Sequence, residues 1–200
     1  MKPELQKLVN DFLSGKGDTA AKAEEELLRL KDPECLEPIL AHTLDWDSPL
    51  WLPAMKVVAA IGENEKTAAF LLGGLVSEDP MTREFAAWAL RNAPQRKAFE
   101  ALKHVAASDA VINARVWALH AIEAIALKYP EAAHEALEVL SAATADLDPS
   151  LRISAYDCIA SLPLAECDAI IENAVNDSDR VIRTVNYPGW HEKRKSMRKK

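Results

Sequence analysis

The sequence is poor in the residues and patterns that build β-sheets and membrane spans. Glycine occurs only six times in 200 residues, and segments that alternate apolar and polar residues are scarce, which argues against a sheet. No apolar run approaches the roughly 18 residues that a membrane-spanning helix needs, and the first residues contain no signal-peptide core. We therefore expect no contact with a membrane and a cytoplasmic location.

Cysteine is scarce as well. Cys35, Cys158 and Cys167 form an odd set without CxxC spacing, which is unlike a disulfide framework and unlike a cysteine-based zinc site. The simplest interpretation is a chain that works in a reducing compartment. Cys158 lies at an apolar position of a predicted helix, so we expect its thiol to be buried.

Sequence motifs of catalysis and cofactor binding are missing too. The chain contains no HExxH, P-loop, GxGxxG or GxSxG motif. No serine or cysteine nucleophile can be matched with a base from the sequence. We therefore predict no catalytic residue, no cofactor and no metal, and we favour a non-enzymatic role while an enzymatic one stays open.

What the sequence does contain is a repeat of roughly 32 residues. Each copy has a slot residue, and in four copies an alanine follows three residues later and a large apolar residue seven residues later. The five slots are held by Trp51, Arg83, Arg115, Arg152 and Arg183. A helical unit that recurs at this period is typical of a solenoid of stacked helices.

The apolar pattern favours helix throughout the repeats. Alanine-rich stretches with 3.6-residue spacing predict amphipathic helices, and a hydrophobic content of 49% suffices for a continuous core. We predict an all-α fold, a right-handed α-solenoid of about six antiparallel helix pairs, as a single domain over residues 1–190. Pro188 and Gly189 are expected to end the last helix early.

Three segments carry a family resemblance: residues 79–86, 148–155 and 179–183. Each has an aspartate followed four residues later by an arginine, and this pattern resembles the HEAT-repeat superfamily, especially its short-period, phycobiliprotein-lyase-like branch. The resemblance implies that the aspartate caps the second helix of a pair and that the arginine links adjacent repeats. The residues in this ladder would be Asp79, Arg83, Arg115, Asp148, Arg152, Asp179 and Arg183. Trp51 departs from the pattern, and Asp109 lies two residues too early relative to Arg115.

The face of the second helices that points away from the packed stripe is the predicted binding surface. In a solenoid this direction lines the concave side, which is the usual binding face. Trp88 is either an exposed anchor for a partner or part of the core, and both interpretations stay open. His120 and Glu123, three residues apart, could orient an imidazole, although a solvated surface histidine is favoured. The candidate residues are Lys56, Glu84, Trp88, Arg91, His120, Glu123 and Asp157.

The charge is unevenly distributed along the chain. The formal net charge is −7, yet residues 191–200 form a basic tail with a single glutamate. A block of like charges has nothing to bury, so we expect no fixed structure there. The tail would either contact nucleic acid or fold back on the acidic body. Its cationic residues are Lys193, Arg194, Lys195, Arg198, Lys199 and Lys200.

These observations predict a scaffold or adaptor that binds a protein with a basic surface on its acidic concave face, for example as a bacterial immunity-type inhibitor. Two alternatives stay open. The resemblance implies a bilin lyase or isomerase subunit of the phycobiliprotein type, and the basic tail would suit a protein that associates with nucleic acid. The pairs His134–Glu135 and His191–Glu192 resemble those of HEAT-type diiron hydroxylases, but that family needs four pairs, so we reject a diiron site.

Overall fold

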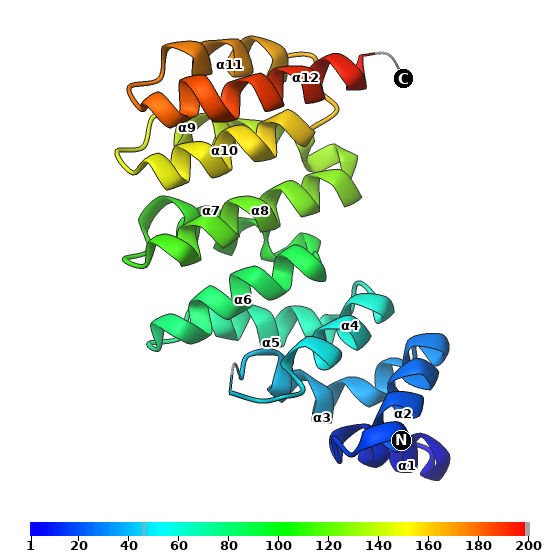
Figure 1. Cartoon of the computed structure of the whole chain (residues 1–200). Helices are drawn as coiled ribbons and strands as arrows, with labels where there is room; N and C mark the ends of the chain where they lie inside the picture. The colour runs from blue at the N-terminus through cyan, green and yellow to red at the C-terminus, as the bar shows by residue number, and fades with distance from the viewer. Residues whose placement is uncertain (46, 199–200) are drawn as a thin grey trace. The chain divides into compact units, whose positions relative to one another are not determined.

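The computed structural model describes residues 1–45 and 47–198, and all regular structure within these ranges is helical (Figure 1). Twelve α-helices in this part of the chain follow one another as about six pairs, which confirms the predicted all-α fold. None of the described helices combines the length and the apolar character that crossing a membrane requires.

The chain divides after Ala101 into two compact units, and we describe each by itself. The predicted single domain over residues 1–190 stays a prediction. The first unit contains α1 (Pro3–Leu13), α2 (Gly17–Leu30), η1 (Pro33–Cys35), α3 (Leu36–Leu40), η2 (Ala41–Thr43), α4 (Trp51–Ile61), α5 (Glu65–Leu75), α6 (Pro80–Asn92), η3 (Arg96–Ala98) and the start of α7 (Phe99–Ser108). The second unit continues with α8 (Ile112–Lys128), η4 (Pro130–Ala132), α9 (Ala133–Ala143), α10 (Pro149–Ser161), α11 (Cys167–Asn173), η5 (Ala174–Asn176), η6 (Ile182–Asn186) and α12 (Tyr187–Met197).

Aspartate side chains begin the second helix of several pairs. Asp79 accepts hydrogen bonds from the backbone amides at the start of α6, and Asp148 does the same for α10. Asp179 accepts from the amides of residues 181 and 182. A carboxylate satisfies amides that lack a helical partner, and the prolines that follow Asp79 and Asp148 need no such partner.

In the first unit, small residues let the helices α5 and α6 approach closely. A Cβ atom added to Gly74 would lie only 2.8 Å from the Cβ of Ala86 and 2.9 Å from Cδ1 of Leu44. The neighbouring Gly73 has open space at the same position. Gly74 is therefore needed for close packing, and Gly73 is not.

In the second unit, α10 is the central helix and contacts α8, α9, α11 and α12. The alanines three residues after the repeat slots, Ala118 and Ala155, are fully buried between these helices. The apolar residues seven after the slots, Ile122 and Ile159, are fully buried as well. The periodic pattern in the sequence thus marks the packed stripe of the second helices.

The last helix differs from the prediction. Pro188 and Gly189 do not end it: α12 runs through both, and the π-helical segment η6 leads directly into α12 just before Pro188. The expectation of no fixed structure from residue 191 fails likewise, since Trp190 packs against Tyr156 with ring centroids 5.2 Å apart and Arg194 is buried. Of the predicted basic tail, Lys199 and Lys200 lie outside the described residues.

Candidate binding sites on the second helices and their loops

The arginine of α10 makes the most complete set of contacts between neighbouring helix pairs. The guanidinium of Arg152 donates to both carboxylate oxygens of Asp177, each at 2.9 Å, and to the carbonyl oxygens of Asp146 and Leu147. The side chains of Arg152 and Asp177 are only 9% and 4% exposed. Such a bidentate pair combines strength with fixed geometry and joins α10 to the following repeat.

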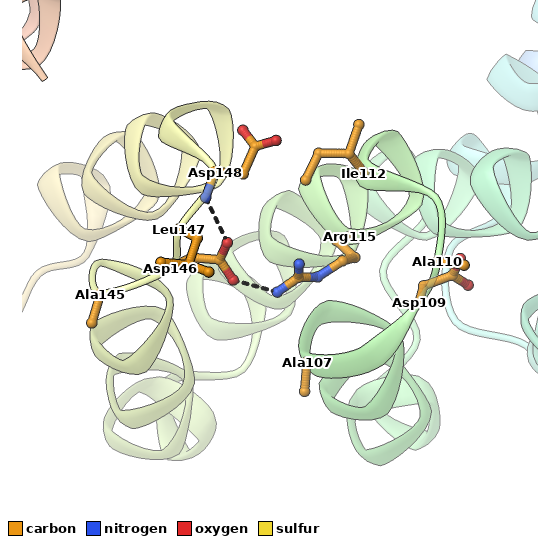
Figure 2. Close-up of a pocket in the computed structure, with 9 residues that line it drawn as sticks. All are labelled: Ala107, Asp109, Ala110, Ile112, Arg115, Ala145, Asp146, Leu147 and Asp148. Atoms are coloured by element: carbon orange, nitrogen blue, oxygen red, sulfur yellow. Dashed lines mark hydrogen bonds and ion pairs between the residues drawn. The ribbon is translucent and has the colours of Figure 1, made fainter.

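Arg115 makes the corresponding contacts one repeat earlier (Figure 2). It donates to the carbonyl oxygen of Ala106 at 2.9 Å and to a carboxylate oxygen of Asp146 at 2.5 Å. Arg83 and Arg183 donate to the two carbonyl oxygens five and six residues before them, which fixes the loop ahead of each second helix. These arginines are therefore engaged by the chain's own loops.

The sequence analysis missed the carboxylates that receive Arg115 and Arg152. Asp146 and Asp177 each lie two residues before a capping aspartate and six residues before the next slot. Asp109 lies six residues before Arg115, so it occupies the same position, and it accepts from the amide of Val111 at 2.8 Å. Asp109 is thus not a displaced capping residue. It occupies a second regular position of the repeat, which an alignment of the loops reveals.

Both receiving aspartates are held in the ionised form. Burial alone would raise the pKa of Asp177, but hydrogen bonds from Arg152 and from the amide of residue 179 bring the pKa below its usual value. Burial of Asp146 is likewise outweighed by bonds from the amide of Asp148 and from Arg115, which lower its pKa. Each of these two carboxylates is therefore negatively charged and is balanced by the arginine that binds it.

Two grooves lie side by side along this loop edge. One, of 680 Å³, is bordered by Asp109, Ile112 and residues 145–148, and the Arg115–Asp146 pair lies inside it (Figure 2). The other, of 390 Å³, is bordered by Arg152, Tyr156 and residues 176–178, and residues 145–147 line both grooves. Between them Leu147 is 97% exposed. We call the surface formed by Asp109, Asp146, Leu147 and Asp148 the acidic edge.

On the second-helix face of the first unit, the predicted residues are dominated by aromatic packing. Trp88 is half-buried, and its ring stacks edge-to-face on Trp51, with centroids 5.0 Å apart, and on Phe85 at 6.5 Å. Trp88 is therefore partly packed and partly accessible. Lys56 pairs with Glu24 on α2 at 3.1 Å. The remaining predicted residues here, Glu84 and Arg91, are half-buried and exposed respectively.

On the same face of the second unit, predicted residues from two helices come together. The Nδ1 atom of His120 on α8 lies 3.5 Å from a carboxylate oxygen of Glu123 and 3.3 Å from the sulfur of Cys158 on α10. Cys158 is fully buried, as predicted, and burial raises the pKa of its thiol. Burial would raise the pKa of Glu123 as well, but hydrogen bonds with His120 and Ser161 lower it overall.

The basic tail completes this polar cluster. Lys193 on α12 donates to the hydroxyl of Ser161 at 2.7 Å and lies 3.9 Å from the carboxylate of Asp157. Ser161 in turn donates to the backbone carbonyl of Asp157 at 3.1 Å. Of the site residues predicted from sequence, the structure thus brings together His120, Glu123, Asp157 and Lys193.

Other cations of the tail are bound by the chain itself. Arg194 donates to Asp168 at 2.7 Å and to the carbonyl oxygens of residues 162 and 164. Arg198 also pairs with Asp168, and Lys195 pairs with Glu192 on its own helix. The pairing lowers the pKa of Asp168, although burial acts the other way. Of the two alternatives for the tail, the described part folds back on the acidic body.

Comparison with known proteins places the fold. No protein-family model and no curated protein matches the sequence. The chain is similar to a chain of the CpcE–CpcF complex of phycocyanin lyase from Nostoc sp. PCC7120, with 17% identity and a TM-score of 0.66 over 80% of this chain and 99% of that chain. The chain therefore shares the fold of that structure, a stack of antiparallel helix pairs, which is the α-solenoid fold predicted from the sequence.

Two further solved structures support the same assignment of the fold. The Escherichia coli protein YibA has 15% identity and a TM-score of 0.65, over 92% of this chain and 64% of that one. Human deoxyhypusine hydroxylase in complex with glycerol has 19% identity and a TM-score of 0.51, over 96% and 74%. At such identities the similarity concerns the fold alone.

Proposed function

We propose that this chain is a protein-binding scaffold and that its acidic edge holds a segment of a partner in which basic and apolar side chains alternate. Stacked helix pairs present extended surfaces that suit this task. The similar structure from Nostoc is itself a complex of two proteins. The observation that carries the proposal is Leu147, 97% exposed between two grooves and next to ionised aspartates.

The two parts of the acidic edge would contribute in different ways. Covering Leu147 with an apolar side chain of the partner would contribute about 1.5–3 kcal/mol to binding. The carboxylates of Asp109, Asp146 and Asp148 would attract basic side chains, which mainly raises the rate of association. They would also set the orientation of the bound segment. Asp146 is already paired with Arg115, so its carboxylate stays engaged within the chain.

The second-helix face predicted from sequence stays a proposal for additional contact. Trp88 keeps part of its ring accessible while it packs on Trp51. A bacterial immunity-type inhibitor would be one form of such a scaffold, since it would mask a basic partner. If Trp88→Ala together with Glu84→Ala abolished binding while substitutions at the acidic edge did not, the docking site would lie on this face instead.

The two alternative functions have less support. A bilin lyase or isomerase role rests on the fold similarity to the phycocyanin lyase chain. A nucleic-acid role through the tail needs free cations, whereas Arg194 and Arg198 are paired with Asp168. Binding of a free bilin, read from its absorption spectrum, would favour the first. Salt-steep binding of DNA that disappears on truncation after residue 190 would favour the second.

A peptide-binding measurement tests the proposed function. The probe is a fluorescein-labelled peptide of alternating lysine and leucine, and its anisotropy is followed during titration with the full chain. The edge variant carries Asp109→Asn, Leu147→Ser and Asp148→Asn, because asparagine preserves the capping bonds while it removes the charge. The control variant carries Glu4→Gln, Asp18→Asn and Leu30→Ser, which are exposed positions in the first unit with the same total change of charge.

We expect the edge variant to bind the basic peptide at least about tenfold more weakly than the wild type, because it loses an apolar contact and two charges. The control variant should change the affinity by less than about twofold. Circular dichroism verifies that both variants are folded. Equal losses in the two variants would show that the attraction follows net charge alone and would overturn the proposal.

A further inference from the structure

Three side chains with metal-binding atoms converge on one point between α8 and α10. Nδ1 of His120, a carboxylate oxygen of Glu123 and the sulfur of Cys158 all lie within 4.8 Å of one another. His120 and Glu123 are one helical turn apart on α8, and Cys158 comes from the facing side of α10. Histidine nitrogen, cysteine sulfur and carboxylate oxygen are the three ligand types that proteins use for zinc.

We propose that His120, Glu123 and Cys158 form a binding site for Zn²⁺ or a divalent ion of similar preference. Zinc bonds of about 2.3 Å to sulfur and about 2.0–2.1 Å to nitrogen, at tetrahedral angles, hold the two ligand atoms about 3.5 Å apart. The observed separation of Nδ1 and sulfur is 3.3 Å, and that of Nδ1 and the carboxylate oxygen is 3.5 Å. Two of the three separations therefore already match a tetrahedral site, and the third lies within 4.8 Å.

The same geometry speaks against a nucleophilic triad. In such a triad the nucleophile and the carboxylate contact opposite nitrogens of the imidazole, so that a proton can pass through the ring. Here Cys158 and Glu123 both face Nδ1 of His120. The sulfur is also fully buried, which keeps it away from any large substrate. Three atoms that face a common point are the arrangement of a ligand set.

Charge and access also suit a divalent cation. The thiol of Cys158 would lose its proton to solvent as the zinc–sulfur bond forms, and no electron transfer is involved. A thiolate and a carboxylate together balance the two charges of the ion, which reduces the cost of holding it in a half-buried place. The side chains of His120 and Glu123 are 15% and 16% exposed, so solvent reaches both residues, and a water molecule would be the fourth ligand.

The surroundings hold the ligands in place. The ring of Trp117 packs beside that of His120, with centroids 5.8 Å apart. Ser161 donates to the backbone carbonyl of Asp157 and receives a hydrogen bond from Lys193, so the tail helix contacts α10 next to the site. No metal was predicted from the sequence, because no second cluster of histidine or acidic residues accompanies His120 and Glu123. Cys158 supplies a third ligand type from the next repeat.

Metal titration of the full chain tests this proposal. The protein is treated with a chelator, exchanged into metal-free buffer and titrated with Zn²⁺ in competition with a chromophoric chelator. In parallel, Co²⁺ replaces Zn²⁺, because its absorption spectrum reports tetrahedral coordination and a thiolate ligand. The site variants are His120→Gln, Glu123→Gln and Cys158→Ser. The controls are Cys35→Ser and Cys167→Ser, which alter the two other buried thiols.

We expect one equivalent of Zn²⁺ to bind, a raised melting temperature with Zn²⁺, and a thiolate-to-cobalt charge-transfer band with Co²⁺. Each site variant should weaken binding by about a hundredfold or more, since loss of a direct ligand exceeds the effect of losing a supporting residue. Both cysteine controls should keep the affinity and the band. Failure to bind Zn²⁺, or a cobalt spectrum that the Cys158→Ser protein retains, would overturn the proposal, and neither result bears on the acidic edge.

Discussion

The second-helix faces of the two units use equivalent positions of the repeat for different chemistry. The position five residues after the slot holds Lys56 in α4, Trp88 in α6, His120 in α8 and Asp157 in α10. In α6 of the first unit this position joins an edge-to-face aromatic group with Trp51 and Phe85, while Lys56 in α4 pairs with Glu24. In the second unit it joins a polar cluster. One helical register thus supports packing in one region and ligand-type side chains in the other.

The contacts that stabilise the two units differ in the same way. In the second unit the pair Arg152–Asp177 is almost inaccessible to water. In the first unit the pairs Lys66–Glu37 and Lys97–Glu65 are well exposed, and such pairs contribute little to stability. We therefore expect the second unit to respond to changes of charge and the first to changes of volume.

The largest expected effect is the loss of the buried ion pair in the second unit. Arg152→Ala leaves the carboxylate of Asp177 buried without its partner and should lower the free energy of unfolding by about 3–5 kcal/mol. Urea denaturation followed by circular dichroism measures it. Lys195→Ala, which removes the exposed partner of Glu192, is the control and should cost less than about 0.5 kcal/mol. Similar costs for both variants would remove the distinction between buried and exposed pairs.

The next effect concerns volume in the first unit. Gly74→Ala places a methyl group against Ala86 and Leu44 and should lower the free energy of unfolding by about 1–3 kcal/mol. Gly73→Ala meets no neighbour within 4 Å and should raise it by about 0.5–1 kcal/mol, because alanine favours the helix. Thermal denaturation compares the two adjacent variants. If both substitutions changed the melting temperature in the same direction, the result would contradict the close approach of α5 and α6.

A smaller effect is the pH dependence of the contacts of α12. The pKa of Asp168 is lowered in the folded chain, so its contribution to stability is complete above the unfolded pKa of about 3.9. The contribution is lost as the pH falls through the lower pKa of the folded state. The difference in melting temperature between the wild type and Asp168→Asn should therefore be largest near neutral pH and should shrink below about pH 4. A constant difference down to about pH 2 would argue against the pairing with Arg194 and Arg198.

Sequence alone predicted the features that repeat within a single helix. The family resemblance implied the caps at Asp79 and Asp148, the local spacing predicted the buried stripe, and the structure has both. Local sequence patterns did not predict the features that depend on contacts between helices. Cys158 meets His120 across a helix interface, and α12 persists through Pro188 because Trp190 and Arg194 are anchored on earlier helices.

The carboxylates that accept hydrogen bonds from the slot arginines follow a sequence pattern of their own. Asp146 and Asp177 recur at the repeat period, and Asp109 shares their position. These loop residues were not predicted, although Asp146 and Asp177 receive the arginines and Asp109 and Asp146 belong to the acidic edge. Loop positions of a solenoid therefore merit the same alignment as its helices.

Site-specific photo-crosslinking tests the central claim, that a partner segment docks on the acidic edge of the second unit. A photo-reactive amino acid replaces Leu147 in the full chain, and a matched protein carries it in place of Leu127, an exposed residue at the far end of α8. Each is irradiated with the lysine–leucine peptide and read by mass spectrometry. We predict an adduct at position 147 that Asp109→Asn with Asp148→Asn suppresses, and little adduct at position 127. Equal adducts at both positions, or none at 147, would contradict the account.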